Sequence, residues 1–580
     1  MQCGQVRVIL VMPRHEIDFD KILSEIGDFG RYQVVFYCFL CAATAIAVLP
    51  GVVALVFQTY VPHYRCMVPG CDNVTSPQYV EPFTNFTIPT GDECRRFWRY
   101  NLTADTCADA DFDDNITVSC TEFVFDDSMF KTSFATQWNL TCHYQPLVEL
   151  PNTLYFSGVL LGSVVFGVIS DRFGRKAALM LAVLIINLVG YLVVLLRSSF
   201  VAVCVLRVLL GLASCGMFQT PFVMAVELVG KRWRVPCGTA LNYFTTLGAL
   251  VAGGLGYAIR DWVQLQLVVT APLLLLFAGF WLCPESVRWL LTQGRTRDAE
   301  RLIRKIAETN GTTVSPHLLA DYDAGGEEEE GDGAPSQREL RDPVRDAEET
   351  SSSEETLIVP AAPSETFLDC MRSRVLRLRL LLALLGWFAV NFAFYGMVVD
   401  LPNMPGDFFT NYFVAGVAEI PGYTLSWVGM DRLGRRITFV LATVLGGVSI
   451  MASGLIPNAM PIPSAVLLML GKCGASGAFA VIYIYTSELF PTSARNTAVG
   501  VCSMTGRISA MLAPQLAVLS VYGESIPLLV IGGVSVVAGL FTLLLPETLG
   551  LPLPETMHDA VSAARTVEVR TPPHTDEDRE

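Results

Sequence analysis

Charge is the scarcest property of this 580-residue sequence. Only 16% of the residues are Asp, Glu, Lys or Arg, whereas 52% are hydrophobic, and the mean hydropathy is +0.45. This composition excludes a soluble multidomain protein, because a chain of this length with so little charge would not stay in solution. It indicates a protein that crosses the membrane several times, with no room for a separate catalytic domain.

Sequence motifs of enzymes are missing as well. No metal-ligand cluster, phosphate-binding glycine loop or hydrolase serine elbow stands where chemistry could use it. We therefore expect no enzyme activity, no cofactor and no metal. All six histidines (15, 63, 143, 317, 558 and 574) lie outside the expected spans, and the first span has no Asp or Glu. A proton relay is not expected, which leaves facilitated diffusion, exchange or Na⁺ coupling open.

Long apolar runs are what the sequence has instead. Runs of about 20 apolar residues suffice to cross a ~30 Å hydrocarbon layer. They start near Gln33, Pro146, Ala177, Phe200, Pro236, Trp262, Val375, Asp407, Ile437, Ile462, Asn496 and Ser525. We predict an all-α membrane protein with twelve transmembrane helices: the first at 33–57, helices two to six at 146–283, and a C-terminal six-helix half at 375–545. Residues 6–12 are too short to be a cleaved signal and include Arg7.

The chain repeats itself at an offset of 260 to 262 residues. GVISDRFGRK at 167–176 recurs as WVGMDRLGRR at 427–436, Glu227 with Arg234 recurs as Glu488 with Arg495, and PES at 284–286 recurs as PET at 546–548. Three matches at nearly the same offset indicate two homologous membrane halves. Transporters use such halves to expose a central site alternately on the two sides of the membrane.

Basic residues predict the orientation of the chain. They cluster in the turns after spans two, four, six, eight and ten and are few in the alternate turns. By the positive-inside rule, both ends of the chain, residues 1–32 and 546–580, are cytoplasmic.

A long segment after the first span, residues 58–145, is rich in cysteines and glycosylation sequons. It contains six cysteines (Cys66, Cys71, Cys94, Cys107, Cys120 and Cys142) and five sequons (at Asn73, Asn85, Asn101, Asn115 and Asn139). We expect an extracellular, glycosylated loop held by disulfides, in any of fifteen possible pairings. Asn310 also begins a sequon, but on the side where we expect no glycan.

The segment 284–374 is expected to be a large cytoplasmic loop. It begins as an amphipathic helix, in which Ala299, Leu302, Ile303 and Ile306 alternate with basic residues. An acidic stretch follows, and its Gly, Ser and Pro content predicts disorder. Residues 321–356 hold fourteen Asp or Glu against three Arg, so most of the net charge of −15 is local. We expect no nucleic-acid partner.

The repeated turns, 171–176 and 431–436, are named here the latch turns. Asp171 can cap a neighbouring helix and pair with basic residues, and such pairs can form in one conformation and part in another. The simpler alternative is that the basic residues only anchor the orientation, but anchoring requires no fixed spacing to Asp and Gly. We assign a gating role to ten residues: Asp171, Arg172, Arg175, Glu227, Arg234, Asp431, Arg432, Arg435, Glu488 and Arg495.

Several motifs resemble one family. They are GDFGRYQ at 27–33, QWNLTC at 137–142, PESVRWL at 284–290, and TSELFP at 486–491 followed by Arg495. The chain resembles the major facilitator superfamily, and within it the organic ion transporters that include organic cation, organic anion and carnitine-type carriers. The resemblance covers nearly the whole chain. It implies a polyspecific transporter of small organic ions in the plasma membrane, with its oligomeric state open.

Arg507 is the main candidate for substrate binding. It lies about eleven residues into span eleven, which at 1.5 Å per residue places it ~17 Å from the cytoplasmic end, near the midplane. VCSMTGRISAMLAP at 501–514, which also contains Ser503, resembles a segment where anion and carnitine-type members carry Arg and cation-selective members carry Asp. The resemblance implies a substrate with a carboxylate or sulfonate. Neutralisation of Arg507 by Glu419 or Glu149 is the alternative.

Other polar and aromatic residues are expected to line the same cavity. Span seven offers Trp387, Asn391, Phe394 and Tyr395 on one helical face, and span ten offers Lys472, Phe479 and Tyr483. Lys472 could bind substrate or pair with Glu419, an acid that resembles the one in cation and carnitine-type members. An Arg opposite an acid and aromatic rings would suit a zwitterion. An organic cation carrier, and less readily a non-transporting receptor or scaffold, remain the alternatives.

Overall fold

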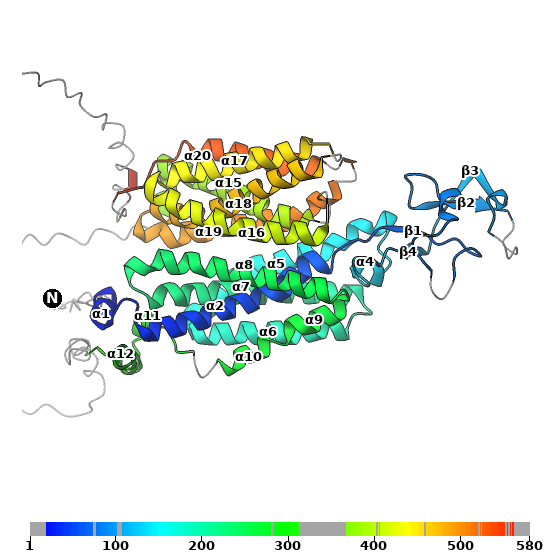
Figure 1. The fold of residues 1–580 in the computed structure, drawn as a ribbon. Coiled ribbons are helices and arrows are strands. Elements are labelled where there is room, and N and C mark those ends of the chain that lie inside the picture. The colour runs from blue at the N-terminus through cyan, green and yellow to red at the C-terminus, as the bar shows by residue number, and fades with distance from the viewer. Residues whose placement is uncertain are drawn as a thin grey trace, which may run out of the picture.

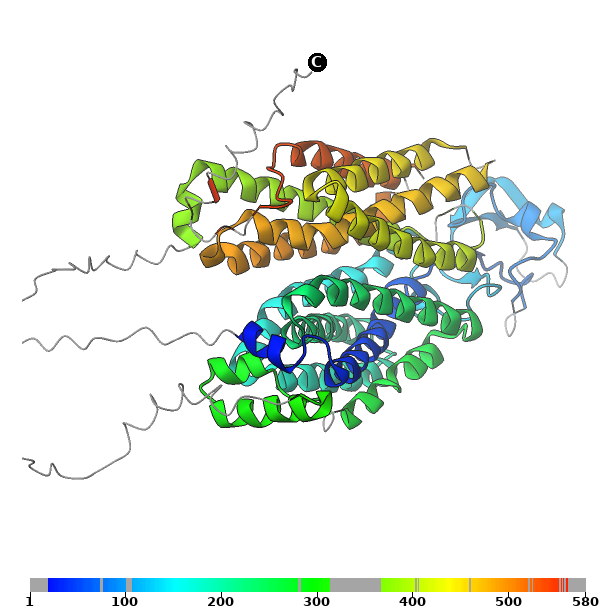
Figure 2. The same ribbon diagram turned by 60° about the vertical axis from the view of Figure 1, so that its left-hand side comes forward.

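The computed structural model describes residues 19–561, apart from 74–76, 101–106, 280–282, 313–366, 402–403, 405, 458–459, 520–521, 524, 552–553, 555–556 and 558–559. The predicted acidic stretch and Asn101 lie outside the described residues. Two helical halves lie side by side, with the disulfide-rich segment at one end and the helices α1 and α12 at the other (Figures 1 and 2). These are named here the loop end and the latch end.

The first half contains α2 (Arg31–Val52), extended by a π-helical turn at Val53–Phe57, then α5 (Leu150–Phe173), α6 (Arg175–Leu195), α7 (Phe200–Leu228), α8 (Arg234–Ala258), α9 (Trp262–Thr270) and α10 (Leu273–Ala278). The second contains α15 (Arg374–Val399), α16 (Phe408–Arg432), α17 (Arg435–Leu455), α18 (Pro461–Leu489), α19 (Thr492–Leu519) and α20 (Ile526–Thr542). A helix begins within four residues of each expected span start. The two halves meet where α5 packs against α19 and α8 packs against α16.

Seven helical segments of the described chain are long and apolar enough to cross a membrane. They are 31–57, 142–173, 175–195, 200–228, 374–399, 435–455 and 462–489. Two further apolar helices, at 262–277 and 526–542, are shorter. Helices suit a bilayer because they satisfy their own backbone hydrogen bonds. That twelve helices cross the bilayer stays a prediction.

The loop end carries a small β-rich subdomain stapled by three disulfides. Strand β1 (Tyr64–Cys66) pairs antiparallel with β4 (Phe123–Phe125), and β2 (Arg95–Arg99) pairs with β3 (Phe112–Ser119). Short helices α3 (Thr84–Thr87) and α4 (Phe134–Gln137) lie between the strands and before α5. The six cysteines pair as Cys66–Cys120, Cys71–Cys107 and Cys94–Cys142, which confirms the expected disulfides and selects one pairing. Asn73, Asn85, Asn115 and Asn139 are exposed.

At the latch end, three short helices pack into their own cluster. They are α1 (Phe19–Ile26), α11 (Val287–Thr292) and α12 (Thr296–Asn310). A further short helix, α14 (Phe367–Arg372), precedes α15 and is not part of this cluster. The amphipathic helix expected after span six is α12, which buries Ala299, Ile303 and Ile306 against α1 and α11. Asn310, at its last residue, donates to the carbonyl of Ile26 at 2.9 Å and accepts from the backbone of Tyr32 at 3.0 Å. The amide of this sequon is therefore part of the packing.

Candidate functional site

A cavity of about 250 Å³ lies between the two halves. Its walls come from α2, α5, α7 and α8 of the first half and from α15, α16, α18 and α19 of the second. This volume is near the lower end of pockets that hold small organic molecules. Eight of the ten predicted substrate residues line it: Asn391, Phe394, Tyr395, Glu419, Lys472, Phe479, Tyr483 and Arg507.

Arg507 reaches the cavity from α19 and contacts the opposite half. Its Nη1 donates to the hydroxyl of Ser503 and, at 3.3 Å, to the carbonyl of the same residue, and its Nη2 donates to Sγ of Cys215 on α7 at 3.5 Å. Its Nε is buried and has no hydrogen-bond partner among the described residues. Nor does any carboxylate of the described chain lie within 4.0 Å of this guanidinium. The positive charge of Arg507 is therefore not neutralised by a neighbouring acid.

Both acids considered as partners of Arg507 are engaged elsewhere. Glu419 forms an ion pair with Lys472, with 3.0 Å between Oε1 and Nζ, and accepts from the hydroxyl of Thr246 at 2.6 Å. Glu149 accepts from the amide of Asn152 at 2.9 Å. Glu419, Lys472 and Arg507 are the charged residues among those that line the cavity. With one pair neutralised, the cavity carries a net charge of +1.

An aromatic wall from α15 and α18 completes this side of the cavity. The rings of Phe394 and Phe479 are stacked, with centroids 5.2 Å apart, and Phe479 contacts Tyr483 at 5.7 Å. The ammonium of Lys472 lies 3.7 Å from the centre of the Phe394 ring. Lys472 therefore makes a cation–π contact with this wall.

Trp387 and Ser503, the other two predicted substrate residues, do not line the cavity. Trp387 is 1% exposed, donates to the hydroxyl of Thr486 at 2.9 Å, and packs its ring 4.4 Å from that of Tyr483. Ser503 accepts the hydrogen bond from Arg507. The structure places both behind the wall, where they position Tyr483 and Arg507.

The first half supplies cavity residues that were not predicted from the sequence. Tyr155, Phe156, Cys215 and Thr246 line the cavity, and Phe156 packs its ring 4.9 Å from that of Tyr395. The repeat was a usable signal. An offset of 261 residues, which carries Glu227 onto Glu488, carries Thr246 onto Arg507. Two related halves should each contribute a wall, whereas the predicted residues all come from the second half.

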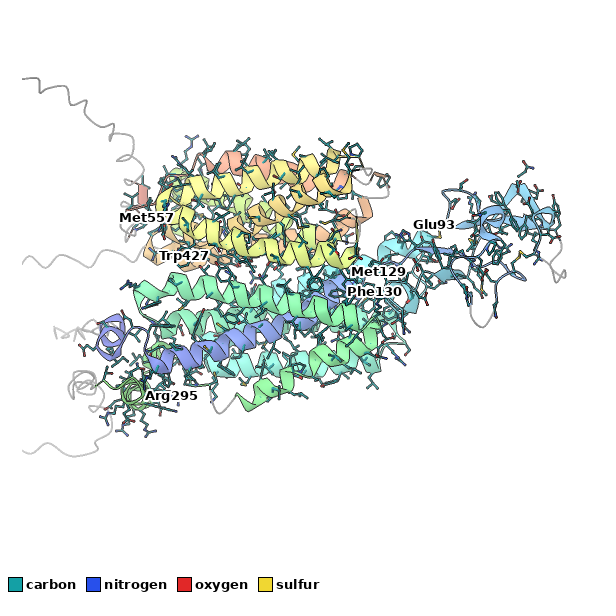
Figure 3. All side chains as sticks on the ribbon, viewed as in Figure 1. Glu93, Met129, Phe130, Arg295, Trp427 and Met557 are labelled. Carbon is teal, nitrogen blue, oxygen red and sulfur yellow. A yellow bond between two sulfur atoms is a disulfide. The ribbon has the colours of Figure 1, made fainter. Side chains whose placement is uncertain are left out.

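Aromatic side chains close the cavity toward the loop end. Phe57 contacts the rings of Phe408, Phe409 and Tyr412 across the two halves, with centroids 6.0, 6.3 and 5.4 Å apart. Phe130, labelled in Figure 3 where the loop subdomain meets the helices, packs against both Phe408 and Phe409. We name these five residues the aromatic seal; each is less than 10% exposed.

The latch turns bring the predicted charged residues together. In the first half, Arg175 pairs with Glu227 at 3.0 Å and with Asp171 at 3.1 Å. In the second half, Arg435 pairs with Glu488 at 3.1 Å. Each pair lies within one half. Arg175 donates to Glu227 through both Nε and Nη2, whereas Arg435 contacts both oxygens of Glu488 through Nε.

A glutamate caps the helix that follows each latch turn. In the sequence this glutamate stood out only because its motif is repeated. The carboxylate of Glu285 accepts from the backbone of Arg175 at 2.8 Å, and that of Glu547 accepts from the backbone of Arg435 at 2.8 Å. The expectation that Asp171 caps the neighbouring helix is wrong, because its side chain is 78% exposed and pairs with Arg175. Carboxylates at helix N-termini are stabilised by the free N–H groups and the helix dipole.

The remaining gating candidates are spread around these pairs. Arg172 is exposed and lies over the ring of Phe173, with 5.6 Å from its guanidinium carbon to the ring centre. Arg234 is the first residue of α8, and Asp431 and Arg432 are exposed at the end of α16. Arg495 donates to the carbonyl of Pro554 at 3.4 Å. These residues all lie at the latch end, but not all of them contact the arginine–glutamate ion pairs.

Comparison with known proteins identifies the family. The model of the "Sugar (and other) transporter" family matches residues 129–559. The chain is 32% identical over 542 residues to the organic cation transporter protein of Drosophila melanogaster, covering 93% of this chain and 94% of that protein. It is 32% identical over 575 residues to organic cation/carnitine transporter 2 of Homo sapiens, covering 96% of each chain. Solute carrier family 22 member 12 of Mus musculus is 33% identical over 561 residues, covering 93% and 95%.

Solved structures share the fold. The D-xylose-proton symporter matches with a TM-score of 0.53 at 13% identity, covering 90% of this chain and 100% of that one. A partially occluded, inward-open form of the xylose transporter XylE from E. coli also scores 0.53 at 13% identity, covering 90% and 99%. Fold and relatives together define a multi-pass membrane transporter, not an enzyme. The chain belongs to the major facilitator superfamily and, within it, to the organic ion transporter family of organic cation and carnitine carriers.

Proposed function

We propose that the protein moves small organic anions or zwitterions, of the carnitine type, across the plasma membrane by alternating access. Arg507 is the observation that carries this proposal. A guanidinium in the middle of a membrane protein, with no acid of the described residues beside it, favours a bound carboxylate or sulfonate, which can accept two hydrogen bonds from it. In this proposal, both termini face the cytoplasm and the disulfide-rich loop faces the outside.

The preference for a zwitterion rests on the aromatic wall. The stacked rings of Phe394 and Phe479 could receive an ammonium or quaternary amine. Glu419 stands next to them through its pair with Lys472, so a cationic group could compete with that lysine for the carboxylate. The name of the human relative, an organic cation/carnitine transporter, supports the same interpretation.

An organic cation carrier is the second candidate. The aromatic wall and Glu419 favour it, and so does the name of the Drosophila relative, an organic cation transporter. The net charge of +1 in the cavity disfavours it, because a cation would enter a cavity whose unneutralised group is Arg507. In a cation carrier, Glu419 would be the anchor.

Uptake by purified protein in liposomes tests the proposal. One radiolabelled anion, one cation and one zwitterion are compared in the wild type and in Arg507→Ala, Arg507→Lys and Arg507→Asp. We expect Ala and Asp to abolish most anion and zwitterion uptake, and Lys to keep the charge but bind more weakly because it lacks the two-point contact. Arg197→Ala is the matched control, since Arg197 is exposed in the turn just after α6. Unchanged anion and zwitterion uptake in Arg507→Ala would remove Arg507 from the site and favour the cation carrier.

A further inference from the structure

A second recess lies at the latch end, on the outer side of the first half. Four basic residues line it: Lys176 from the first turn of α6, and Arg295, Arg301 and Lys305 from the start and body of α12. Phe173 and Leu302 contribute apolar walls. We name it the basic recess. Figure 3 labels Arg295 beside α12, at the outer edge of the first half.

The acids of the basic recess are already engaged. Glu285 accepts from the backbone of Arg175 and Lys176, at 2.8 and 3.2 Å. Asp298 pairs with Arg295 at 2.6 Å and with Arg301 at 3.3 Å. Four basic and two acidic side chains leave a net charge of +2. The recess is therefore suited to a ligand with more than one negative charge.

An exposed apolar surface continues along α6 from the recess. Helix α6 starts at Arg175 and exposes Leu181, Leu184 and Leu188, which are 37%, 51% and 57% exposed. Leu181 is five residues after Lys176, which is ~8 Å along the helix axis at 1.5 Å per residue. Helix α10, which packs on α6, exposes Leu275 at 71%. One molecule with a charged head and apolar chains could contact both surfaces at once.

We propose that the basic recess binds the phosphorylated headgroup of an anionic glycerophospholipid, with its acyl chains along α6 and α10. Basic residues at a cytoplasmic membrane surface attract anionic lipids, and a cavity adds shape to that attraction. The bound lipid links the first turn of α6, which holds the latch turn, to α12, which packs on the N-terminal helix α1. The second half repeats the latch turn, but among the described residues no counterpart of α11 and α12 follows its last helix, α20.

Matched double variants on one helix test the site. Arg301→Gln with Lys305→Gln removes two charges that line the recess, whereas Arg297→Gln with Arg304→Gln removes two exposed charges of α12 that do not. The side chain of Arg301 is 79% exposed, so the first pair leaves the packing intact. Arg301→Lys with Lys305→Arg keeps the charge and checks that the site needs it.

Binding of dioctanoyl phosphatidylinositol phosphate to the full-length protein in detergent is measured by native mass spectrometry and by the shift in Tm. We expect the recess variant to bind about thirtyfold more weakly, from ~1 kcal/mol for each basic residue near an anionic membrane surface and ~1.4 kcal/mol for each tenfold. The control and the charge-conserving variant should stay close to the wild type, and dioctanoyl phosphatidylcholine should not bind there. Equal losses in the recess and control variants would reduce the effect to general surface charge and overturn the proposal. So would an absence of binding, or equally tight binding of the free inositol phosphate.

Discussion

The carboxylate of Glu419 lies 3.0 Å from the ammonium of Lys472 inside the central cavity, and both side chains are largely withdrawn from solvent. Lys472 also lies over the ring of Phe394. The pair therefore fixes two charges on the wall of the proposed substrate site and leaves Arg507 as its unneutralised group.

Breaking this pair should destabilise the protein more than removing it. Glu419→Gln leaves Lys472 buried without its partner, which costs ~3–5 kcal/mol for a buried ion pair. Glu419→Gln combined with Lys472→Met removes both charges and should recover most of that loss. Thermal unfolding of purified protein in detergent measures the effect. Additive losses in the double variant would contradict the buried pair.

The two ion pairs of Arg175 should contribute unequally to gating. Its pair with Glu227 is 13% and 17% exposed, whereas Asp171 is 78% exposed. Exposed pairs contribute only ~0–1 kcal/mol. We expect Arg175→Ala, and its copy Arg435→Ala, to lower turnover at least about tenfold at unchanged surface amount, and Asp171→Asn to lower it by a smaller factor. Uptake normalised to surface protein measures this, and normal turnover in Arg175→Ala would refute the gating role.

Gly174 should tolerate no side chain. Its φ is +101°, and a Cβ atom would lie 2.2 Å from Oε2 of Glu285, the carboxylate that caps α6. Gly294 also has a positive φ of +69°, but a Cβ atom there would meet nothing within 4 Å, so Gly294→Ala should cost only ~1–2 kcal/mol. Gly174→Ala should lower both Tm and transport well beyond this control. Equal Tm losses in the two variants would mean that the cap does not depend on Gly174.

Glycans should occupy the loop and not the latch end. Enzymatic deglycosylation should increase electrophoretic mobility, and Gln substitutions at Asn73, Asn85, Asn101, Asn115 and Asn139 together should abolish that change. Asn310→Gln is the matched control and should leave mobility unaltered, because the Asn310 amide is bonded to Ile26. A mobility change that persists in the five-site variant would place glycans elsewhere and reverse the proposed topology.

Much of the fold could be predicted from the sequence because membrane helices are long and apolar. The latch partners were also predictable, since Glu227 and Glu488 recur at the same spacing from their turns. That Glu285 caps α6 was not predictable, because this contact depends on how the chain after span six packs against the first turn of α6. Fifteen disulfide pairings satisfy the same spacing, and only the loop fold selects one.

Helical spacing predicted part of the candidate site, but it could not show which residues reach the cavity. Helical spacing indicates that Trp387, Asn391 and Phe394 share a face. Residues on one helical face can nevertheless lie at different distances from the cavity. Trp387 lies behind Tyr483, with its indole bonded to Thr486. Which residue of a face reaches the cavity depends on the neighbouring helix, and that is a property of tertiary packing.

The aromatic seal has a thermal consequence. The rings of Phe57, Phe408 and Tyr412 are buried against each other across the two halves, so opening the loop end must expose apolar surface to water. Exposure of apolar surface raises the heat capacity. If this opening limits the transport cycle, an Arrhenius plot of uptake should curve, and its apparent activation enthalpy should rise with temperature. Breaking the ion pairs at the latch end should not curve the plot in this way. The loop end should therefore contribute more than the latch end to the temperature dependence of the cycle.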